Sequence, residues 1–452
     1  MKTDKNSLPG IDTGFKSQVI KKLHRSCAWL LSLVLLYSAE VWAEPATATV
    51  SAAQTIQVLT WWQSSGEHKA VDVLSERLTQ ENIIWHDVVI PSGGVGAGIV
   101  LKSRVLAGTA PDMAQLKGPL IGEWFELGLI DEFKPLAGAA PNNASGKWDK
   151  SFFPTVQELV RSNGHLVAVP LGVHRMNMIF YNRKVFDRLG LRAPESWDEF
   201  TAVATRLQKE GIIPLAQSTE PWQLASLFEA LLLSESSPEF YRRALVKKDP
   251  SAFSDSRFAR ALTRLRLLKK FMSAPVKELN WSDATRLVAT GDAGMIVMGD
   301  FAKGELNAWG YTTDVNFGCV AVPNTGNYHI YNVDTLVMLK KGGASPELAD
   351  RIAQLMVSPN VQADYNIAKG SVSVLKNADQ TRMDSCARSS WKVFSHGSAV
   401  QVPSLAHDMA TDGISKDAII AEIVHFFADD SIKVEQTQHR LGAITRSLPK
   451  PR

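Results

Sequence analysis

The sequence predicts an α/β protein with two domains, and two observations support this. Strand-like and helix-like segments alternate three times near the start of the chain. Alternation at this spacing indicates helices packed on a largely parallel sheet. The chain has 452 residues, and about 409 remain without its N-terminal targeting segment, a length typical of two domains.

The three strand–helix units lie between residues 55 and 126. In the first unit, the strand-like run is followed by apolar residues at helical spacing, such as Ala70, Val71 and Leu74. The expected strands are residues 55–60, 86–90 and 112–116, and the expected helices are residues 68–80, 99–107 and 119–126.

A glycine-rich stretch, Gly93–Gly98, connects the second strand to its helix. It lacks the Gly-Lys-Ser/Thr ending of a phosphate-binding loop and the G-x-G-x-x-G spacing of a dinucleotide site. A flexible connection near a ligand is therefore the favoured interpretation.

The rest of the chain mixes strands and helices. Ser196, followed three residues later by Glu199, has the pattern of a capping box at a helix start. The further strands are expected at residues 165–169, 176–181, 294–298, 317–322 and 333–339. Residues 222–272 are mostly helical in pattern, and one amphipathic helix each is expected at residues 346–358 and 416–444.

Residues 1–43 have the features of a secretory signal peptide. A basic region containing Lys21, Lys22 and Arg25 precedes an apolar run at residues 27–39, and Ala43 ends a small-residue cleavage site. The apolar run is short for a transmembrane helix. We therefore expect export by a cleaved signal peptide and a periplasmic location.

Charge and cysteine content narrow the class of protein. Residues 1–43 contain six basic and three acidic residues, so their removal leaves equal numbers of each. This balance gives no indication of a nucleic-acid or anionic-membrane partner.

Cys319 and Cys386 remain after removal of the signal. In an exported protein they are candidates for a disulfide, with two buried free thiols as the alternative. Two cysteines without clustered histidines do not make a zinc site, so no metal or other cofactor is expected.

A tryptophan pair, Trp61-Trp62, follows the first strand, with Glu67 shortly after it. Flat apolar rings beside hydrogen-bonding groups suit a sugar, because a pyranose has an apolar face and a rim of hydroxyls. A core role for the tryptophans is the alternative. Successive side chains on a strand face opposite sides, so both rings cannot point inward. For Glu67, the alternative is a carboxylate at a helix N-terminus.

Several segments, in order along the chain, resemble the bacterial extracellular solute-binding proteins of the maltose-binding type. Within that family the chain is most similar to periplasmic glucose- or mannose-binding proteins of ABC importers. The matching segments are VLTWWQSSGE (58–67), QLKGPLIGEWFELGLI (115–130), VAVPLGVHRMNMIFYN (167–182), PESWDEF (194–200), GDAGMIVMGDFAKGE (291–305), YNVDTLVML (331–339), NIAKGSVSV (366–374) and VPSLAHDMA (402–410).

The resemblance implies a two-lobed periplasmic binding protein fold, with each lobe a discontinuous α/β domain and the ligand in an interlobe cleft. Hinge motion would close the lobes on the ligand. The N-terminal lobe is expected from residues 44–170 and 330–372, and the C-terminal lobe from residues 171–329 and 373–452. The expected crossings lie near residues 168–173, 326–333 and 370–376.

The resemblance also implies a set of sugar-binding residues that combines aromatic rings, acceptors and donors. The acceptors are carboxylates and an amide, and the donors are two lysines and a histidine. The set is Trp61, Trp62, Glu67, Lys117, Asp300, Phe301, Asn332, Asp334, Lys369 and His407. Trp222, Trp281, His174 and Arg175 are further candidates near the cleft.

Phe301 departs from the family pattern, which often has tryptophan directly after the Gly299-Asp300 turn. A phenylalanine can still stack on a sugar, but it offers less area and no N–H donor. The departure leaves open a larger ligand or an altered sugar preference.

The resemblance implies a binding protein without enzymatic activity. We expect a monomer that captures a monosaccharide, with a glucose-like hexose favoured, and delivers it to the permease subunits of an ABC importer. Presentation of the sugar to a chemoreceptor is a further option. An oligosaccharide or polyol ligand is the alternative. A secreted glycoside hydrolase, which would pair Glu67 with Asp300, is a remote one, because eight repeated strand–helix units are not seen.

Overall fold

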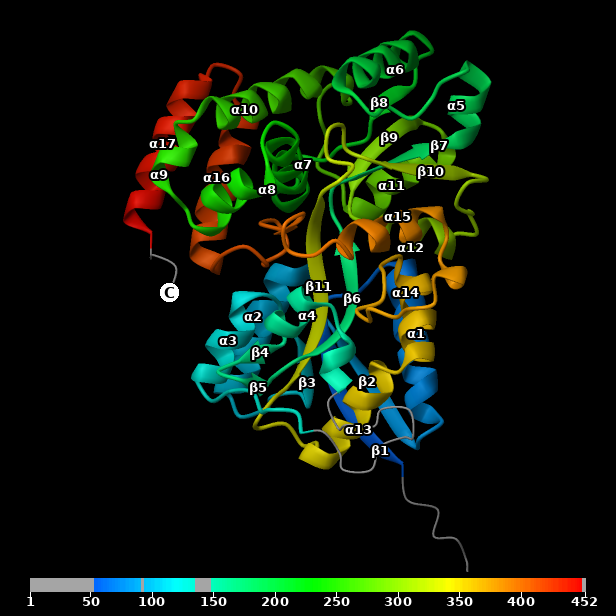
Figure 1. Cartoon of the computed structure of the whole chain (residues 1–452), viewed down its shortest axis with the longest axis vertical. Helices are drawn as coiled ribbons and strands as arrows, with labels where there is room; N and C mark the ends of the chain where they lie inside the picture. The colour runs from blue at the N-terminus through cyan, green and yellow to red at the C-terminus, as the bar shows by residue number, and fades with distance from the viewer. Residues whose placement is uncertain (1–52, 91–92, 135–147, 449–452) are drawn as a thin grey trace, which may run out of the picture. The chain divides into compact units, whose positions relative to one another are not determined.

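The computed structural model describes residues 53–90, 93–134 and 148–448. The signal peptide predicted over residues 1–43 therefore lies outside the described residues. The described chain has two lobes, each with its own hydrophobic core, and the predicted two-lobed α/β fold is confirmed. Strands β6 (Val169–Arg175) and β11 (His329–Met338) pair with each other and run from one lobe toward the other (Figure 1).

The N-terminal lobe is built on a mixed sheet with the order β12–β11–β3–β1–β2, and β6 pairs with β11. The pairs that arise from the strand–helix units, β1 with β2 and β1 with β3, are parallel, as predicted. Strand β11 lies antiparallel to both β3 and β6 because it arrives from the other lobe and not through a local helix. Strand β12 is parallel to β11, so the sheet is mixed, and its two antiparallel pairs are those of β11 with β3 and with β6.

Most predicted elements of this lobe are present with shifted bounds, but the glycine-rich stretch predicted as a flexible connection is instead the start of a helix at Gly93. The strands of this lobe are β1 (Gln54–Thr60), β2 (Ile83–Val89), β3 (Met113–Gln115), β4 (Arg161–Ser162), β5 (His165–Leu166) and β12 (Gln401–Pro403), and its helices are α1 (Ser65–Thr79), α2 (Gly93–Leu106), α3 (Pro119–Glu126), α4 (Pro154–Leu159), α13 (Pro346–Met356), α14 (Pro359–Lys369) and α15 (Ser385–Phe394).

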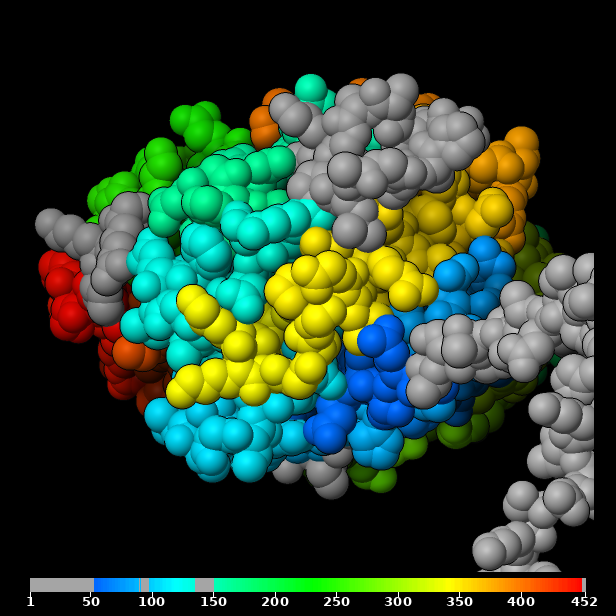
Figure 2. Space-filling view, turned by 90° about the horizontal axis from the view of Figure 1, so that it is seen from below, coloured from blue at the N-terminus to red at the C-terminus, as the bar shows by residue number. Residues whose placement is uncertain are grey.

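Segments that are distant in the sequence assemble this lobe. On the face seen in Figure 2, residues near the start of the described chain, coloured blue, lie beside the yellow segment that contains α13. An ion pair between Arg351 on α13 and Glu81 after α1, with 3.6 Å between Nη2 and Oε2, joins them.

The C-terminal lobe contains a four-stranded sheet with the order β10–β7–β9–β8. Its first three strands are antiparallel, and β8 is parallel to β9. Its strands are β7 (Met178–Asn182), β8 (Ile213–Leu215), β9 (Ala293–Met298) and β10 (Phe317–Ala321), and its helices are α5 (Arg183–Leu189), α6 (Trp197–Lys209), α7 (Pro221–Ser234), α8 (Pro238–Tyr241), α9 (Pro250–Phe253), α10 (Ser256–Leu268), α11 (Trp281–Thr290), α12 (Phe301–Ala308), α16 (Gly413–Ala428) and α17 (Val434–Ser447).

The start of α6 agrees with the sequence prediction, whereas the end of α16 does not. The predicted capping box of α6 is present, with Ser196 and Glu199 bonded reciprocally. The single helix expected over residues 416–444 is instead two helices. Asp429 has an extended backbone, and its carboxylate accepts from the Ser431 N–H at 2.9 Å, which ends α16 with a turn.

Helix α15 is attached to both lobes. Its buried Ala387 and Phe394 belong to the N-terminal core, which differs from the lobe boundary expected after residue 372. Cys386 on the same helix forms a disulfide with Cys319 on β10 of the C-terminal sheet. Among the described helices, none combines the length and apolar content needed to cross a bilayer.

Candidate functional site

The ends of several elements from both lobes converge on one region. Trp61 and Trp62 follow β1, and Lys117 follows β3. Asp334 lies on β11, and Lys369 is the last residue of α14. From the C-terminal lobe, Asp300 and Phe301 begin α12, and His407 lies in the loop after β12.

Buried ion pairs connect these residues. Lys117 Nζ lies 2.8 Å from Asp334 Oδ1, and Lys369 Nζ lies 3.1 Å from Glu67 Oε1 and 4.0 Å from Asp334 Oδ2. Burial would raise the pKa of Asp334, but Lys117 and His174 hold it well below its usual range. The site therefore places an ionised carboxylate acceptor beside lysine donors, an arrangement suited to neighbouring hydroxyl groups.

Glu67 has the alternative role considered for it, a carboxylate at a helix N-terminus, and one of its oxygens also faces Lys369. Its Oε2 accepts from the N–H of Ser64 at 3.1 Å and thereby caps α1, while Oε1 faces Lys369. Burial would raise the pKa of Glu67, but Lys369 and the N–H groups of Ser64 and Gln63 lower it below the usual value. The cap fixes the carboxylate in place without occupying its second oxygen.

His174, on β6, bridges two carboxylates. Its Nδ1 lies 2.5 Å from Asp300 Oδ1, and its Nε2 lies 3.1 Å from Asp334 Oδ2. Burial would lower the pKa of His174, but Asp300 and Asp334 raise it above the usual value, which favours the imidazolium. The neighbouring Arg175 is directed elsewhere, since its Nη2 donates to the carbonyl oxygens of Gly326 and Tyr328.

The two tryptophans have different surroundings. Trp62 is only 1% exposed, lies in the N-terminal core, and its ring centroid is 6.3 Å from that of Tyr365. Trp61 is half-buried, and Lys117 Nζ lies 4.9 Å from its ring centroid. Trp61 is therefore the more accessible of the two rings, while Trp62 also forms part of the core and has Lys369 Nζ 5.4 Å from its ring.

A second aromatic group lies at the start of α12. The centroid of Phe301 lies 4.9 Å from that of Trp281, 6.2 Å from that of Trp222 and 6.0 Å from that of His407. Phe301 is 9% exposed, whereas Trp222 and Trp281 are half-buried. The two tryptophans considered as further candidates thus flank the phenylalanine that replaces the expected tryptophan.

Two buried amides in this region have unused acceptors. Gln115 Nε2 donates to Asp334 Oδ1 at 3.2 Å, but its Oε1 has no hydrogen-bond partner within the described part of the chain. The same holds for Oδ1 of Asn332, which pairs with His174 across β6 and β11. Buried polar atoms are normally satisfied, so these acceptors are suited to a ligand donor. Gln115 was missed in the sequence, although its place at the end of β3, beside Lys117, could have indicated it.

The family model for bacterial extracellular solute-binding proteins matches residues 79–363. The chain belongs to this family. A probable sugar-binding periplasmic protein of Rhizobium meliloti is 30% identical over 402 residues, which cover 88% of this chain and 95% of the relative. A xylose/arabinose-binding protein of Haloferax volcanii is 25% identical over 369 residues, which cover 78% and 77% of the two chains.

Solved structures of solute receptors share the fold of this solute-binding protein. The receptor AcbH, described with an exclusive preference for β-D-galactopyranose, matches with a TM-score of 0.73 at 18% identity and covers 88% of this chain and 99% of its own. The maltose-bound MalE3 of T. maritima matches with a TM-score of 0.68 at 17% identity, covering 87% and 99%. The homologues and structural neighbours are receptors, so this solute-binding protein is not an enzyme, and the hydrolase alternative is wrong.

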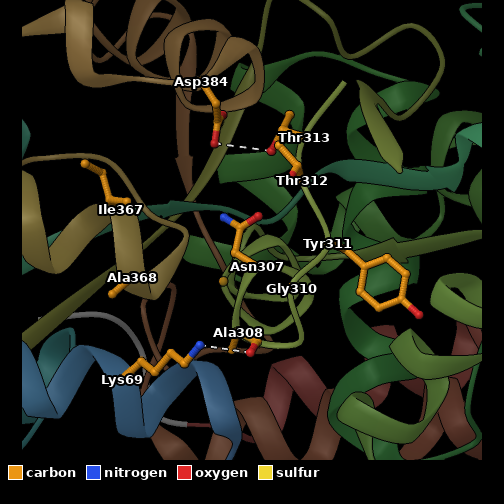
Figure 3. Close-up of a pocket in the computed structure, with 11 residues that line it drawn as sticks. Lys69, Asn307, Ala308, Gly310, Tyr311, Thr312, Thr313, Ile367, Ala368 and Asp384 are labelled. Carbon is orange, nitrogen blue, oxygen red and sulfur yellow. Dashed lines mark hydrogen bonds between the residues drawn. The ribbon is translucent and has the colours of Figure 1, made fainter. Parts of the chain in front are cut away.

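A cavity of about 440 Å³ is present in the described part of the chain (Figure 3). Residues of α1, α12 and α14 line it, together with the loop after α12, and Lys69 Nζ donates to the Ala308 carbonyl at 2.9 Å beside it. None of the ten predicted residues lines this cavity. Within the described residues, no group of His, Cys, Asp or Glu side chains is arranged to hold a metal ion.

Proposed function

We propose that this solute-binding protein is the periplasmic sugar receptor of an ABC importer, and that its ligand is a monosaccharide, with a glucose-like hexose favoured. The observation that carries the proposal is the buried array in which Lys117 and Lys369 alternate with Glu67 and Asp334. The half-buried ring of Trp61 lies directly beside it.

This array suits a neutral polyhydroxylated ligand. A carboxylate accepts and a lysine side chain donates, so the hydroxyl and ring oxygens of a ligand would replace contacts that these side chains make with one another. The positive and negative charges are balanced within the array, so a neutral ligand need not bring a counter-charge into a buried site. A ring with an apolar face can pack on Trp61 while its hydroxyls meet the charged groups.

Relatives support the sugar class. Four curated relatives, among them those of Rhizobium meliloti and Brucella melitensis, bear the name probable sugar-binding periplasmic protein. The structural neighbours include proteins described with galactopyranose, maltose, raffinose and tagatose. This range keeps an oligosaccharide or polyol as the alternative ligand, and Trp222 and Trp281 beside Phe301 would provide aromatic surface for additional rings.

Capture would proceed by closure of the two lobes, followed by docking of the monomeric receptor on the permease subunits. Hydrogen bonds between the two lobes, of the kind that would stabilise a closed form, are present. The N–H of Gly66 on α1 donates to Glu305 Oε2 on α12 at 2.6 Å, and Asp300 is joined to His174.

Titration calorimetry against hexoses, pentoses, disaccharides and polyols tests the proposal. We expect one hexose to bind most tightly and Lys117→Met to weaken it, whereas the exposed Lys209→Met should bind as the wild type does. A disaccharide that binds more tightly than every monosaccharide would select the alternative ligand. A folded protein that binds no carbohydrate in the panel would contradict the sugar proposal.

A further inference from the structure

A buried glutamate anchors the loop that carries His407. Glu229 lies on α7 in the C-terminal lobe and is fully buried. Its Oε2 accepts from the N–H of Leu405 at 2.6 Å and from the N–H of Ala406 at 3.3 Å. Its Oε1 accepts from the Ser404 hydroxyl at 2.6 Å. One carboxylate thus holds three consecutive residues of the loop.

The Ser404 hydroxyl also contacts His407, with 2.9 Å between Oγ and Nδ1. A hydroxyl has one proton to donate, and an ionised carboxylate can only accept. When Glu229 is ionised, Ser404 must therefore donate to Glu229 and accept from His407. The proton of the imidazole is then on Nδ1.

The His407 imidazole is neutral. Burial and the positive charges of Lys117 and His174 lower its pKa well below the usual value. A neutral imidazole with its proton on Nδ1 has a lone pair on Nε2. No hydrogen-bond partner of Nε2 is present among the described residues, and the ring is held edge-on to Trp222, with centroids 5.5 Å apart.

We propose that Glu229 is a positioning residue that, through Ser404, fixes the proton of His407 on Nδ1 and makes Nε2 an acceptor for a ligand hydroxyl. The ligand part of this inference rests on the proposed function. It changes the role expected for His407, which the sequence had placed among the donors. A ligand group that meets His407 must then donate a proton, as a sugar hydroxyl can and an ether oxygen cannot.

Protonation of Glu229 would reverse this arrangement. Burial raises the pKa of Glu229 to about 7. Because Oε2 already receives two N–H groups, an added proton belongs on Oε1, where it faces Ser404. Ser404 would then donate to His407 Nδ1, and Nε2 would carry the proton.

Two other titratable groups bear on this change, Tyr241 beside Glu229 and His174 near His407, and the pKa of His174 is itself raised above its usual value by Asp300 and Asp334. The Tyr241 hydroxyl lies 3.1 Å from Glu229 Oε2, and burial raises its pKa well above the usual value, so it stays neutral. The charged groups that act on His407 are Lys117, His174, Asp334 and Lys416.

Nitrogen NMR of the imidazole tests the inference on the unliganded protein, with the His407 signal assigned by its loss in His407→Gln. At about pH 8.5, above the pKa of Glu229, the wild type should have its proton on Nδ1. Glu229→Gln should move it to Nε2, because the amide oxygen must face the two loop N–H groups and its NH₂ then donates to Ser404. The exposed Glu239→Gln is the matched control and should leave the tautomer unchanged.

A wild-type protein with the proton on Nε2 at this pH, or the same tautomer in Glu229→Gln, would overturn the inference. If Glu229→Gln does not fold, Ser404→Ala removes only the connecting hydroxyl and should abolish the preference for Nδ1; retention of that preference would also overturn it. In titrations with the hexose selected by the panel, Glu229→Gln should weaken binding about tenfold, the effect of one lost hydrogen bond. Absence of sugar binding by the wild type would contradict the proposed function, whereas the NMR result would stand by itself.

Discussion

His174 on β6 and Asp300 at the start of α12 are joined by a contact of 2.5 Å between Nδ1 and Oδ1. The strand contributes to the core of the N-terminal lobe, and the helix contributes to the core of the C-terminal lobe. The same imidazole reaches Asp334 on β11, so a single cation lies between the two carboxylates where the lobes meet.

Replacement of His174 by glutamine should destabilise the protein by about 3–5 kcal/mol, because it leaves two buried carboxylates without their shared cation. Urea unfolding at about pH 6, where the imidazolium is populated, measures this free energy. His439→Gln on the exposed face of α17 is the matched control and should stay close to the wild type. A His174→Gln protein as stable as the control would mean that the bridge contributes nothing.

The contact between His174 and Asp300 predicts that the free energy of unfolding depends on pH. Asp300 and Asp334 raise the pKa of His174 above its usual 6.5, despite the opposing effect of burial. The stabilisation from the bridge is therefore complete below about pH 6.5 and is lost as the pH rises through the raised value. The free energy of unfolding of the wild type should fall over that range by more than that of His174→Gln. Parallel curves for the two proteins would contradict the assignment of the imidazolium.

Sequence reasoning predicted what local patterns and the family resemblance specify. The alternation of apolar residues placed β1 and α1, and residues at the ends of elements supplied Trp61, Glu67 and Lys117. The bridge formed by His174 could not be predicted in this way. It depends on the register of β6 against β11 and on the docking of α12, which are properties of the assembled lobes.

The role of Glu229 is a second example of what the sequence could not supply. Glu229 precedes Ser404 by 175 positions and lies in a helix that is otherwise largely apolar. The apolar residues around it indicate a buried helix, but nothing local identifies the loop at residues 404–407 as the partner of its carboxylate. Likewise, strand alternation indicated that the two tryptophans face opposite sides, but only the packing of Tyr365 identified Trp62 as the inward ring.

Substitution of Trp62 should affect mainly the stability of the protein, and substitution of Trp61 should affect mainly sugar binding. Trp62→Ala empties a core position and should cost about 3–5 kcal/mol of unfolding free energy. Trp61→Ala should leave most of the stability intact but weaken sugar binding by about 1–3 kcal/mol, the effect of losing an aromatic surface. Thermal unfolding and calorimetry of both variants measure the two effects. A Trp61→Ala protein with wild-type affinity would remove that ring from the site.

Phe301→Trp should change which ligand fits. Phe301 is enclosed by Trp281, Trp222 and His407, so an indole at this position overfills the space and should cost about 1–3 kcal/mol of stability. The larger ring would also take volume from the ligand. In the sugar panel, disaccharides should lose more affinity than hexoses. An unchanged ranking of ligands would show that Phe301 does not set the size of the pocket; the conservative Phe301→Leu variant controls for loss of the ring.

The substitution Gly66→Ala on α1 tests whether closure of the lobes depends on the close approach of α1 and α12. A Cβ added at Gly66 would lie 2.8 Å from the Glu305 nitrogen and from the Gly304 carbonyl carbon on α12, a distance that real side chains do not adopt. Gly66→Ala should therefore force α1 and α12 apart and remove the hydrogen bond from the Gly66 N–H to Glu305.

The expected result for Gly66→Ala is an affinity for the sugar at least about tenfold weaker, mostly through faster dissociation, because the ligand is no longer enclosed. Stopped-flow kinetics measure the dissociation rate, and small-angle scattering with bound sugar reports whether the lobes stay apart. Gly98→Ala on α2 is the matched control, since its added Cβ would meet nothing within 4 Å. It should bind as the wild type does and be slightly more stable, because alanine favours a helix over glycine. A Gly66→Ala protein that closes fully on the sugar would mean that α1 and α12 can separate locally without opening the lobes.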